Sequence, residues 1–301
     1  DAASPSDFWG GIAYFPDLTG QLWKLDMSKT GLGETNSSMW TLTKAFRSEG
    51  TLANDRFGYN QMATTLVNSS TPIGTNVFNY FGTGDQAHLQ RRDATIKNRI
   101  YGVKDLDFPD TDLATTGSSK TISSSGIFKI SGADASSSWC SSVDVPGWYA
   151  DVLDVSSLDT GVDDFIKVVG RALAASDDVY FTLYRPDDLA CPIGGKSQVV
   201  KMIKSCAGGY SVIATGAGLS TAPVMDSKGN IYVGVGNLAT DGELDIEASE
   251  SEKRSGVDNI LKIGSSDISA SPSPSSSLKP PGIRIKSWRQ LPNKNFMDSY
   301  R

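Results

Sequence analysis

The chain has 301 residues, of which 39% are hydrophobic, so it is long enough to bury a sizeable core as one all-β domain. Its 34 acidic and 28 basic residues give a net charge of −6, and the lysines and arginines form no stripe of the kind that binds nucleic-acid phosphates. No apolar run reaches the roughly 18 residues of a membrane-spanning helix. The composition therefore argues against nucleic-acid binding and against a membrane span.

The first predicted element is a β-hairpin over residues 10–26, GGIAYFPDLTGQLWKLD. Two short runs of aromatic, aliphatic and β-branched residues flank residues 16–20, whose proline, aspartate and glycine are typical of a turn. The same design recurs where residues 226–230 lead into 231–234. Because the first strand signal follows Asp1 so closely, we expect the chain to be part of a longer protein.

The next part of the chain alternates weak strands with polar connections. Residues 27–74 indicate a long connection with strands at 40–43 and 62–67, and residues 75–105 predict two strands joined by a segment in which 86–96 form a short helix. Residues 109–146 are rich in serine, threonine, aspartate and glycine, which favours a rim loop with one strand at 127–130.

From residue 147 the strand signals become regular, with turn residues about 8 to 15 residues apart. Residues 241–254 are charged and are predicted to be partly helical. Residues 265–281 are predicted to form a flexible Ser/Pro linker. About a dozen strands suffice for roughly three to four blades. The predicted fold is a partial β-propeller with long rim loops. The predicted strands are 147–153, 166–169, 179–184, 198–203, 210–214, 222–224, 231–235, 260–263 and 283–291.

The three cysteines are Cys140, Cys191 and Cys206. Cys191 and Cys206 each lie beside turn residues. A disulfide between them would close a loop of about 15 residues and stabilise the fold by roughly 3 kcal/mol, because it lowers the conformational entropy of the unfolded chain. The alternative is two independent buried thiols. We favour the disulfide, which implies an oxidising, secreted setting. Cys140 is then expected to pair with a cysteine outside this sequence.

Several strands resemble signature sequences of the PilY family, the type IV pilus tip and biogenesis proteins that include the neisserial PilC adhesins. Residues 17–26 are similar to the family's D-x-x-G-x-L-W-x-x-D hairpin, and residues 80–84 and 100–105 to its FGTG and YG-x-x-D strands. Further landmarks follow in the family's order: GWY at 147–149, a strand, Pro turn, Cys and Gly-Gly pattern over 179–195, and SWRQ at 287–290. The matched signature residues are Asp17, Gly20, Trp23, Asp26, Gly82, Gly84, Tyr101, Gly102, Trp148 and Trp288.

The resemblance implies a non-enzymatic, extracellular β-propeller at the pilus tip or the outer-membrane surface. Its implied partners are minor pilins and the N-terminal part of its own precursor, which would carry adhesive specificity. The implied roles are adhesion, pilus assembly and surface sensing.

The family's calcium loop is degenerate in this chain. Its loop positions fall on Ala3, Pro5, Asp7 and Gly11, so only Asp7 keeps a carboxylate, whereas Ca²⁺ takes about six to eight oxygen ligands. We expect this site to have lost calcium or to bind it weakly through backbone oxygens and Asp1. An acid-rich loop contributes two further weak candidates, Asp241 and Asp245, whose spacing fits no EF-hand.

Sequence features argue against three other classes of function. A quinoprotein dehydrogenase uses vicinal cysteines, which this chain lacks, and an electron-transfer protein would need a C-x-x-C-H haem site. A carbohydrate-binding or carbohydrate-active propeller would use tryptophans to stack sugars, but tryptophans on strands are usually core residues. The sole histidine, His88, has no accompanying G-x-S-x-G motif, so we assign no catalytic residue and expect His88 on the surface.

Overall fold

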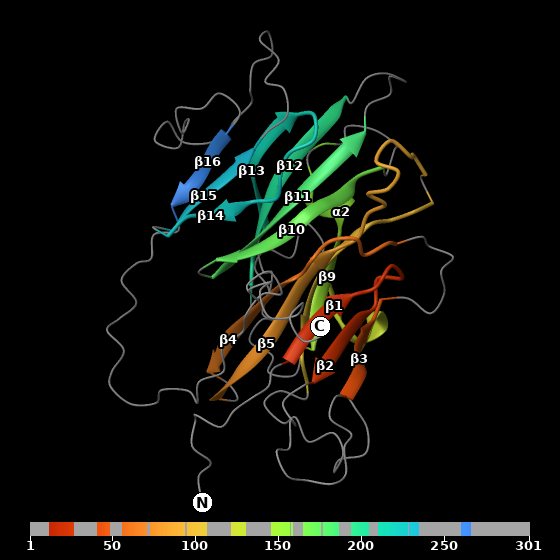
Figure 1. Cartoon of the computed structure of the whole chain (residues 1–301), viewed down its shortest axis with the longest axis vertical. Helices are drawn as coiled ribbons and strands as arrows, with labels where there is room; N and C mark the ends of the chain where they lie inside the picture. The colour runs from red at the N-terminus through yellow and green to blue at the C-terminus, as the bar shows by residue number, and fades with distance from the viewer. Residues whose placement is uncertain are drawn as a thin grey trace, which may run out of the picture.

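The computed structural model describes residues 12–26, 41–48, 56–70, 73–93, 95–106, 122–130, 146–156, 158, 165–175, 177–186, 194–204, 210–227, 229–234 and 260–265. Within these ranges the chain forms sixteen β-strands and one four-residue helix, α2 (Val152–Val155). The strands make four separate sheets, of which the first two lie in the lower part of the molecule and the other two in the upper part (Figure 1). This arrangement confirms the predicted all-β fold, a partial β-propeller.

The first sheet has the strand order β1-β2-β3-β7. β1 and β2 form the predicted hairpin, in which Phe15 lies opposite Trp23, and β3 continues it in antiparallel fashion. β7 pairs with β3 in parallel. The bounds are β1 (Ile12–Pro16), β2 (Leu22–Asp26), β3 (Thr41–Arg47) and β7 (Ile122–Ser123).

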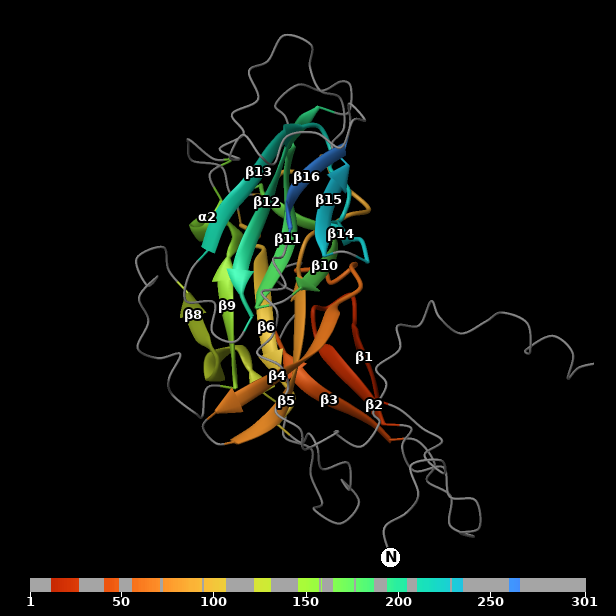
Figure 2. The same ribbon diagram turned by 90° about the vertical axis from the view of Figure 1, so that its left-hand side faces the viewer.

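The second sheet lies beside the first and has the order β4-β5-β6-β9-β8 (Figure 2). Its edge strand β8 is parallel to β9, and only the 3-10 turn η3 (Ser124–Gly126) and Ile127 separate β8 from β7 in the chain. Residues 122–130 therefore give one strand to each sheet and join them. The bounds are β4 (Ala63–Ser70), β5 (Ile73–Gly82), β6 (Arg99–Lys104), β9 (Gly147–Asp151) and β8 (Phe128–Ile130).

The third and fourth sheets are simple antiparallel meanders of the kind found in propeller blades. Together they form the upper part of the molecule in Figure 1. The third contains β10 (Lys167–Ala175), β11 (Asp178–Pro186), β12 (Gly195–Ile203) and β13 (Tyr210–Ala217), and the fourth contains β14 (Val224–Met225), β15 (Asn230–Gly234) and β16 (Ile260–Ser265).

The central strands of the second sheet, β5 and β6, are buried on both faces, because this sheet lies between the first and the third. Successive side chains of a strand point to opposite faces. Tyr80 and Ile100 accordingly pack in a cluster with the third sheet, whereas Phe81 and Tyr101 pack with the first. This explains why β5 and β6 carry nearly continuous apolar runs instead of a clean alternation.

The helix predicted for residues 86–96 is wrong, because the described residues of this segment form turns. The amide of His88 donates to the Asp85 carboxylate, and the amide and hydroxyl of Thr95 donate to Asp93. Lys167, from the third sheet, donates to the carbonyls of His88 and Leu89. Such side-chain bonds compete with helical ones for the same backbone groups. His88 does lie on the surface, with 70% of its side chain exposed.

The strand predicted over 147–153 ends at Asp151, where the amide of Val152 donates to the carbonyl of Asn98 and α2 begins. Ser265, placed at the start of the predicted linker, is the last residue of β16. None of the described helices is long and apolar enough to cross a membrane. Several predicted features lie outside the described residues and stay predictions: Cys191, Cys206, Trp288, the metal candidates Asp1, Asp7, Asp241 and Asp245, the rest of the 265–281 linker, and the segments 241–254 and 283–291.

Candidate functional site

The turn between β1 and β2 is built around the carboxylate of Asp17. Oδ1 accepts hydrogen bonds from the amides of Thr19 (2.8 Å) and Gln21 (3.0 Å) and from the Thr19 hydroxyl (2.6 Å). Oδ2 accepts one from the indole Nε1 of Trp23 at 2.8 Å. Gly20 has a φ of 73°, a conformation that glycine adopts without strain. Three signature residues, Asp17, Gly20 and Trp23, thus form one structural unit.

The turn before β15 repeats this unit in the fourth sheet. Asp226 Oδ1 accepts from the Asn230 amide at 2.9 Å, and Oδ2 accepts from the hydroxyl of Tyr232 at 3.2 Å. Gly229 has a φ of 83°, matching Gly20. The shared pattern is D-x-x-G-x-[LI]-[WY], in which an aromatic donor six residues after the aspartate reaches back to it. The recurrence of this design is confirmed at the level of individual hydrogen bonds.

Replacing Asp17 with alanine should destabilise the fold at neutral pH by about 1–3 kcal/mol, because several half-buried donors lose a charged acceptor. Burial alone raises the pKa of Asp17, but the hydrogen bonds from Thr19, Trp23 and Gln21 outweigh it and hold the pKa below its ordinary 3.8. The folded state therefore favours the carboxylate. This stabilisation is complete above the ordinary pKa and is lost as the pH falls through the lowered one.

The measurement is urea unfolding of wild type and Asp17→Ala at a series of pH values. The difference between them should shrink on acidification. Asp93→Ala is the matched control, because Asp93 accepts the same pair of bonds from Thr95 in an exposed turn and should matter much less. A difference that is constant from neutral to acid pH would contradict the assignment.

A buried ion pair connects the first two sheets. Lys24 on β2 places its Nζ 2.7 Å from Oδ2 of Asp105, which follows β6, and the two side chains are only 1% and 2% exposed. The hydroxyl of Tyr14 donates to the same Oδ2 at 2.6 Å. Asp26 lies on the same face of β2 as Lys24 and is buried as well. The pair thereby links the two signature segments LWKLD and YGVKD.

Three signature glycines lie where neighbouring strands or sheets approach closely. A Cβ on Gly82 would come within 2.3 Å of the side chain of Val168 on β10, and one on Gly84 within 2.8 Å of Lys167 Cβ. A Cβ on Gly102 would lie 2.4 Å from the indole of Trp148, directly across the β6–β9 pairing. Packing between the second and third sheets therefore depends on the absence of side chains at Gly82 and Gly84.

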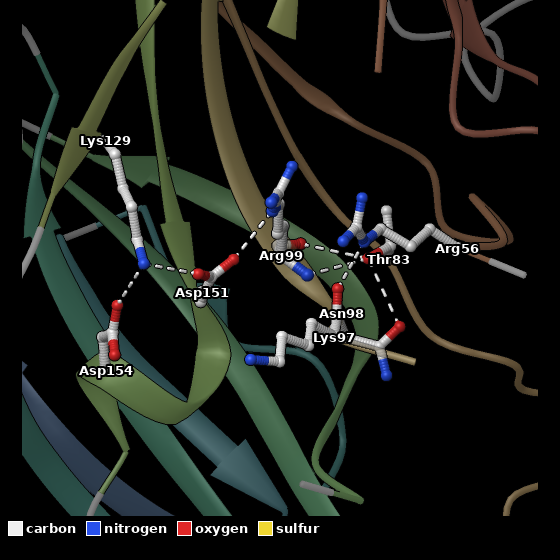
Figure 3. A network of polar contacts seen from close by, with 8 residues as sticks. All are labelled: Arg56, Thr83, Lys97, Asn98, Arg99, Lys129, Asp151 and Asp154. Carbon is white, nitrogen blue, oxygen red and sulfur yellow. Dashed lines mark hydrogen bonds and ion pairs between the residues drawn. The ribbon is translucent and has the colours of Figure 1, made fainter. Parts of the chain in front are cut away.

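A polar network lies at the ends of β6, β8 and β9 (Figure 3). Asp151 accepts from Arg99 Nε and from Lys129 Nζ, each at 2.7 Å, and Lys129 also contacts Asp154 at 3.1 Å. Burial alone raises the pKa of Asp151, but Lys129 and Arg99 outweigh it and lower the pKa. The Arg99 guanidinium also lies over the Tyr149 ring, 4.4 Å from its centroid.

The same network continues toward the third sheet. The Thr83 hydroxyl accepts the Arg99 amide at 2.9 Å, and Asn98 Nδ2 donates to the Ile166 carbonyl at 2.9 Å. Arg56 donates through Nε to the Lys97 carbonyl (Figure 3). Burial, followed by the charge of Arg99, lowers the pKa of Arg56. These contacts connect the end of β5 and the starts of β6 and β10.

A small hollow lies beside this network. Burial lowers the pKa of Lys167 to about 8, but its ammonium is already held by two backbone carbonyls. The buried Asp85 and Asn98 are likewise engaged, with His88 and with Ile166. The polar side chains at the base of the hollow are thus engaged in internal contacts. Its lining residues are Asp85, Arg91, Asp93, Ile96, Asn98, Phe165 and Lys167.

Several charged side chains around the signature residues could not be recognised from the sequence. Lys24, Asp151 and Lys167 received no role from the sequence, and nothing local to them signals one. Only the apolar flanks of Lys24 hint that its side chain is buried. Among the described residues, no three His, Cys, Asp or Glu side chains gather as a metal site would require.

This arrangement of four sheets has a counterpart of known structure. The fold resembles that of the C-terminal domain of PilY1 from Pseudomonas aeruginosa. The likeness has a TM-score of 0.50 at 16% sequence identity and covers 84% of this chain. The chain spans 57% of the length of that PilY1 chain. No family model matches the sequence, and no curated protein matches it.

At this level of identity, the likeness to PilY1 concerns the fold alone. The signature residues acquire defined places in it: Asp17, Gly20 and Trp23 in a turn, Gly82 and Gly84 between sheets, and Gly102 against Trp148. Tyr101 and Asp26 are buried beside the contact between the first and second sheets.

Proposed function

We propose that this chain is a non-enzymatic propeller module of an extracellular type IV pilus protein. In this proposal it docks on minor pilins at the pilus tip and supports adhesion, pilus assembly or surface sensing by the rest of a longer chain. The supporting observation is the combination of a PilY1-like fold with PilY-type signature residues at its turns and sheet contacts.

The internal chemistry of the described residues suits a scaffold. Charged side chains form ion pairs between strands and sheets, as in the pairs Lys24–Asp105 and Arg99–Asp151. A module that connects a pilus to an adhesive domain has to transmit force without changing shape. Buried ion pairs and closely packed glycines between neighbouring sheets provide that rigidity, because interiors packed at this density resist deformation.

Binding to minor pilins is the direct test. The purified chain is immobilised and exposed to a purified minor-pilin complex of a type IV pilus, with a quinoprotein propeller domain of similar size as the matched control. We expect retention of the pilins on this chain and not on the control. Deletion of the protein in its host should also reduce piliation.

Two results would contradict the proposal. One is retention no better than that of the control together with unchanged piliation. The other is the absorbance of a bound quinone in the purified protein, which would favour a dehydrogenase. A glycan array tests the remaining alternative, a carbohydrate-binding propeller. Such a protein would bind sugars selectively and would not retain pilins.

A further inference from the structure

Lys24 and Asp105 meet under unusual conditions for a lysine and an aspartate. The two residues come from different sheets, and their Nζ and Oδ2 atoms are 2.7 Å apart. Their side chains are 1% and 2% exposed, so water has almost no access to the pair. Neighbouring residues of the same segments, Leu22 and Val103, belong to the hydrophobic cluster between the two sheets.

The groups around the pair are those that an amide-forming reaction requires. Tyr14 donates its hydroxyl to Oδ2 of Asp105 at 2.6 Å, where it would stabilise negative charge that develops on this oxygen. Asp26 is buried two residues after Lys24 on the same face of β2, so the strand face that carries the amine also carries a second carboxylate. A carboxylate in this position can move protons between the amine and a leaving hydroxyl.

We propose that Lys24 and Asp105 form an intramolecular isopeptide bond. The bond can form only from the neutral pair, in which one proton has passed from the ammonium to the carboxylate that it contacts. The neutral amine of Lys24 then attacks Cγ of the protonated Asp105, and the Nζ–Cγ bond forms. Asp26 takes a proton from the nitrogen and delivers it to the hydroxyl on Cγ. The Cγ–O bond breaks and one water leaves, with no oxidant or reductant involved.

The fixed geometry supplies the driving force that such a condensation lacks in solution. Two reacting groups held in contact behave as if present at very high effective concentration, and expulsion of the water product opposes the reverse reaction. A second pair in the same molecule shows the contrast. Lys129 and Asp151 are also 2.7 Å apart, but the Lys129 side chain is 44% exposed. Solvent keeps that pair ionised, and we expect it to remain an ion pair.

The test is the intact mass of the purified, folded chain after reduction of its cysteines. The expected mass is that of the sequence minus one water. Proteolysis should release a branched peptide in which Lys24 and Asp105 are joined, identified by fragmentation. The water loss should disappear in Lys24→Met and Asp105→Ala, and become slow or absent in Asp26→Asn. It should persist in the control Lys129→Met.

A wild-type mass equal to that of the sequence would overturn the proposal. So would a water loss that survives in Lys24→Met, because this indicates a succinimide at an aspartate instead of a cross-link. The branched peptide is sought in the wild-type protein, so it decides the question even if a variant fails to fold. The result is independent of pilin binding, and the proposed function can fail without affecting it.

Discussion

Replacing Lys24 with methionine should lower the free energy of unfolding by roughly 3–5 kcal/mol, the cost of removing one partner of a buried ion pair. Asp105 would then be left buried and charged, with Tyr14 but without its cation. Asp105→Leu should have a comparable effect by leaving the ammonium without its carboxylate. The same direction holds if the two residues are joined as an amide, because either variant removes the link between the first two sheets.

Chemical denaturation followed by far-UV circular dichroism measures this effect. Lys129→Met is the matched control, since its ion pairs to Asp151 and Asp154 are partly exposed and should contribute at most about 1 kcal/mol. The double variant Lys24→Met with Asp105→Leu should be more stable than either single variant, because neither member of the pair is then left buried and charged without the other. Unfolding of Lys24→Met at the wild-type midpoint would show that the pair does not tie the sheets together.

Replacing Trp148 with alanine should cost roughly 3–5 kcal/mol, as expected for a large aromatic side chain removed from a core. Trp148 is 1% exposed and belongs to the cluster that packs the second sheet on the third. Gly102→Ala acts on the same contact from the opposite strand. Its new methyl group would fall 2.4 Å from the indole and should cost about 1–3 kcal/mol through overpacking.

The two changes should not be additive, because the methyl of Gly102→Ala fits the space that Trp148→Ala vacates. We therefore expect the double variant to be more stable than the sum of the single effects predicts. Gly126→Ala is the matched control, since a Cβ there would meet only the Ser123 hydroxyl at an ordinary 3.7 Å. Full additivity, or a Gly102→Ala variant as stable as Gly126→Ala, would contradict direct packing of Gly102 on Trp148.

Local chemistry made the hairpin units predictable. The turn at Asp17 closes within six residues, so its aspartate, glycine and tryptophan are all local to it. The same is true of Asp226, Gly229 and Tyr232. Strand content was equally accessible, because the apolar runs of β5, β6 and β11 are too short for helices and bounded by turn residues.

The helix expected at 86–96 shows where local reasoning fails. The segment carries residues that tolerate a helix, but the carbonyls of His88 and Leu89 accept from Lys167, which lies far away in the sequence. Asp85 and Asp93 add their own bonds to nearby amides. A pattern confined to the segment contains no information about Lys167.

The sequence alone determined the β-hairpins and the strand-rich composition, because their hydrogen bonds and alternation close over a few residues. Only the tertiary structure decided that Lys24 meets Asp105, that Gly102 accommodates Trp148, and that Lys167 is anchored on the 86–96 segment. Each of these contacts joins strands or sheets whose relative placement depends on how the four sheets stack. Stacking is set by the shape and burial of all of them together, and no short stretch of sequence encodes it.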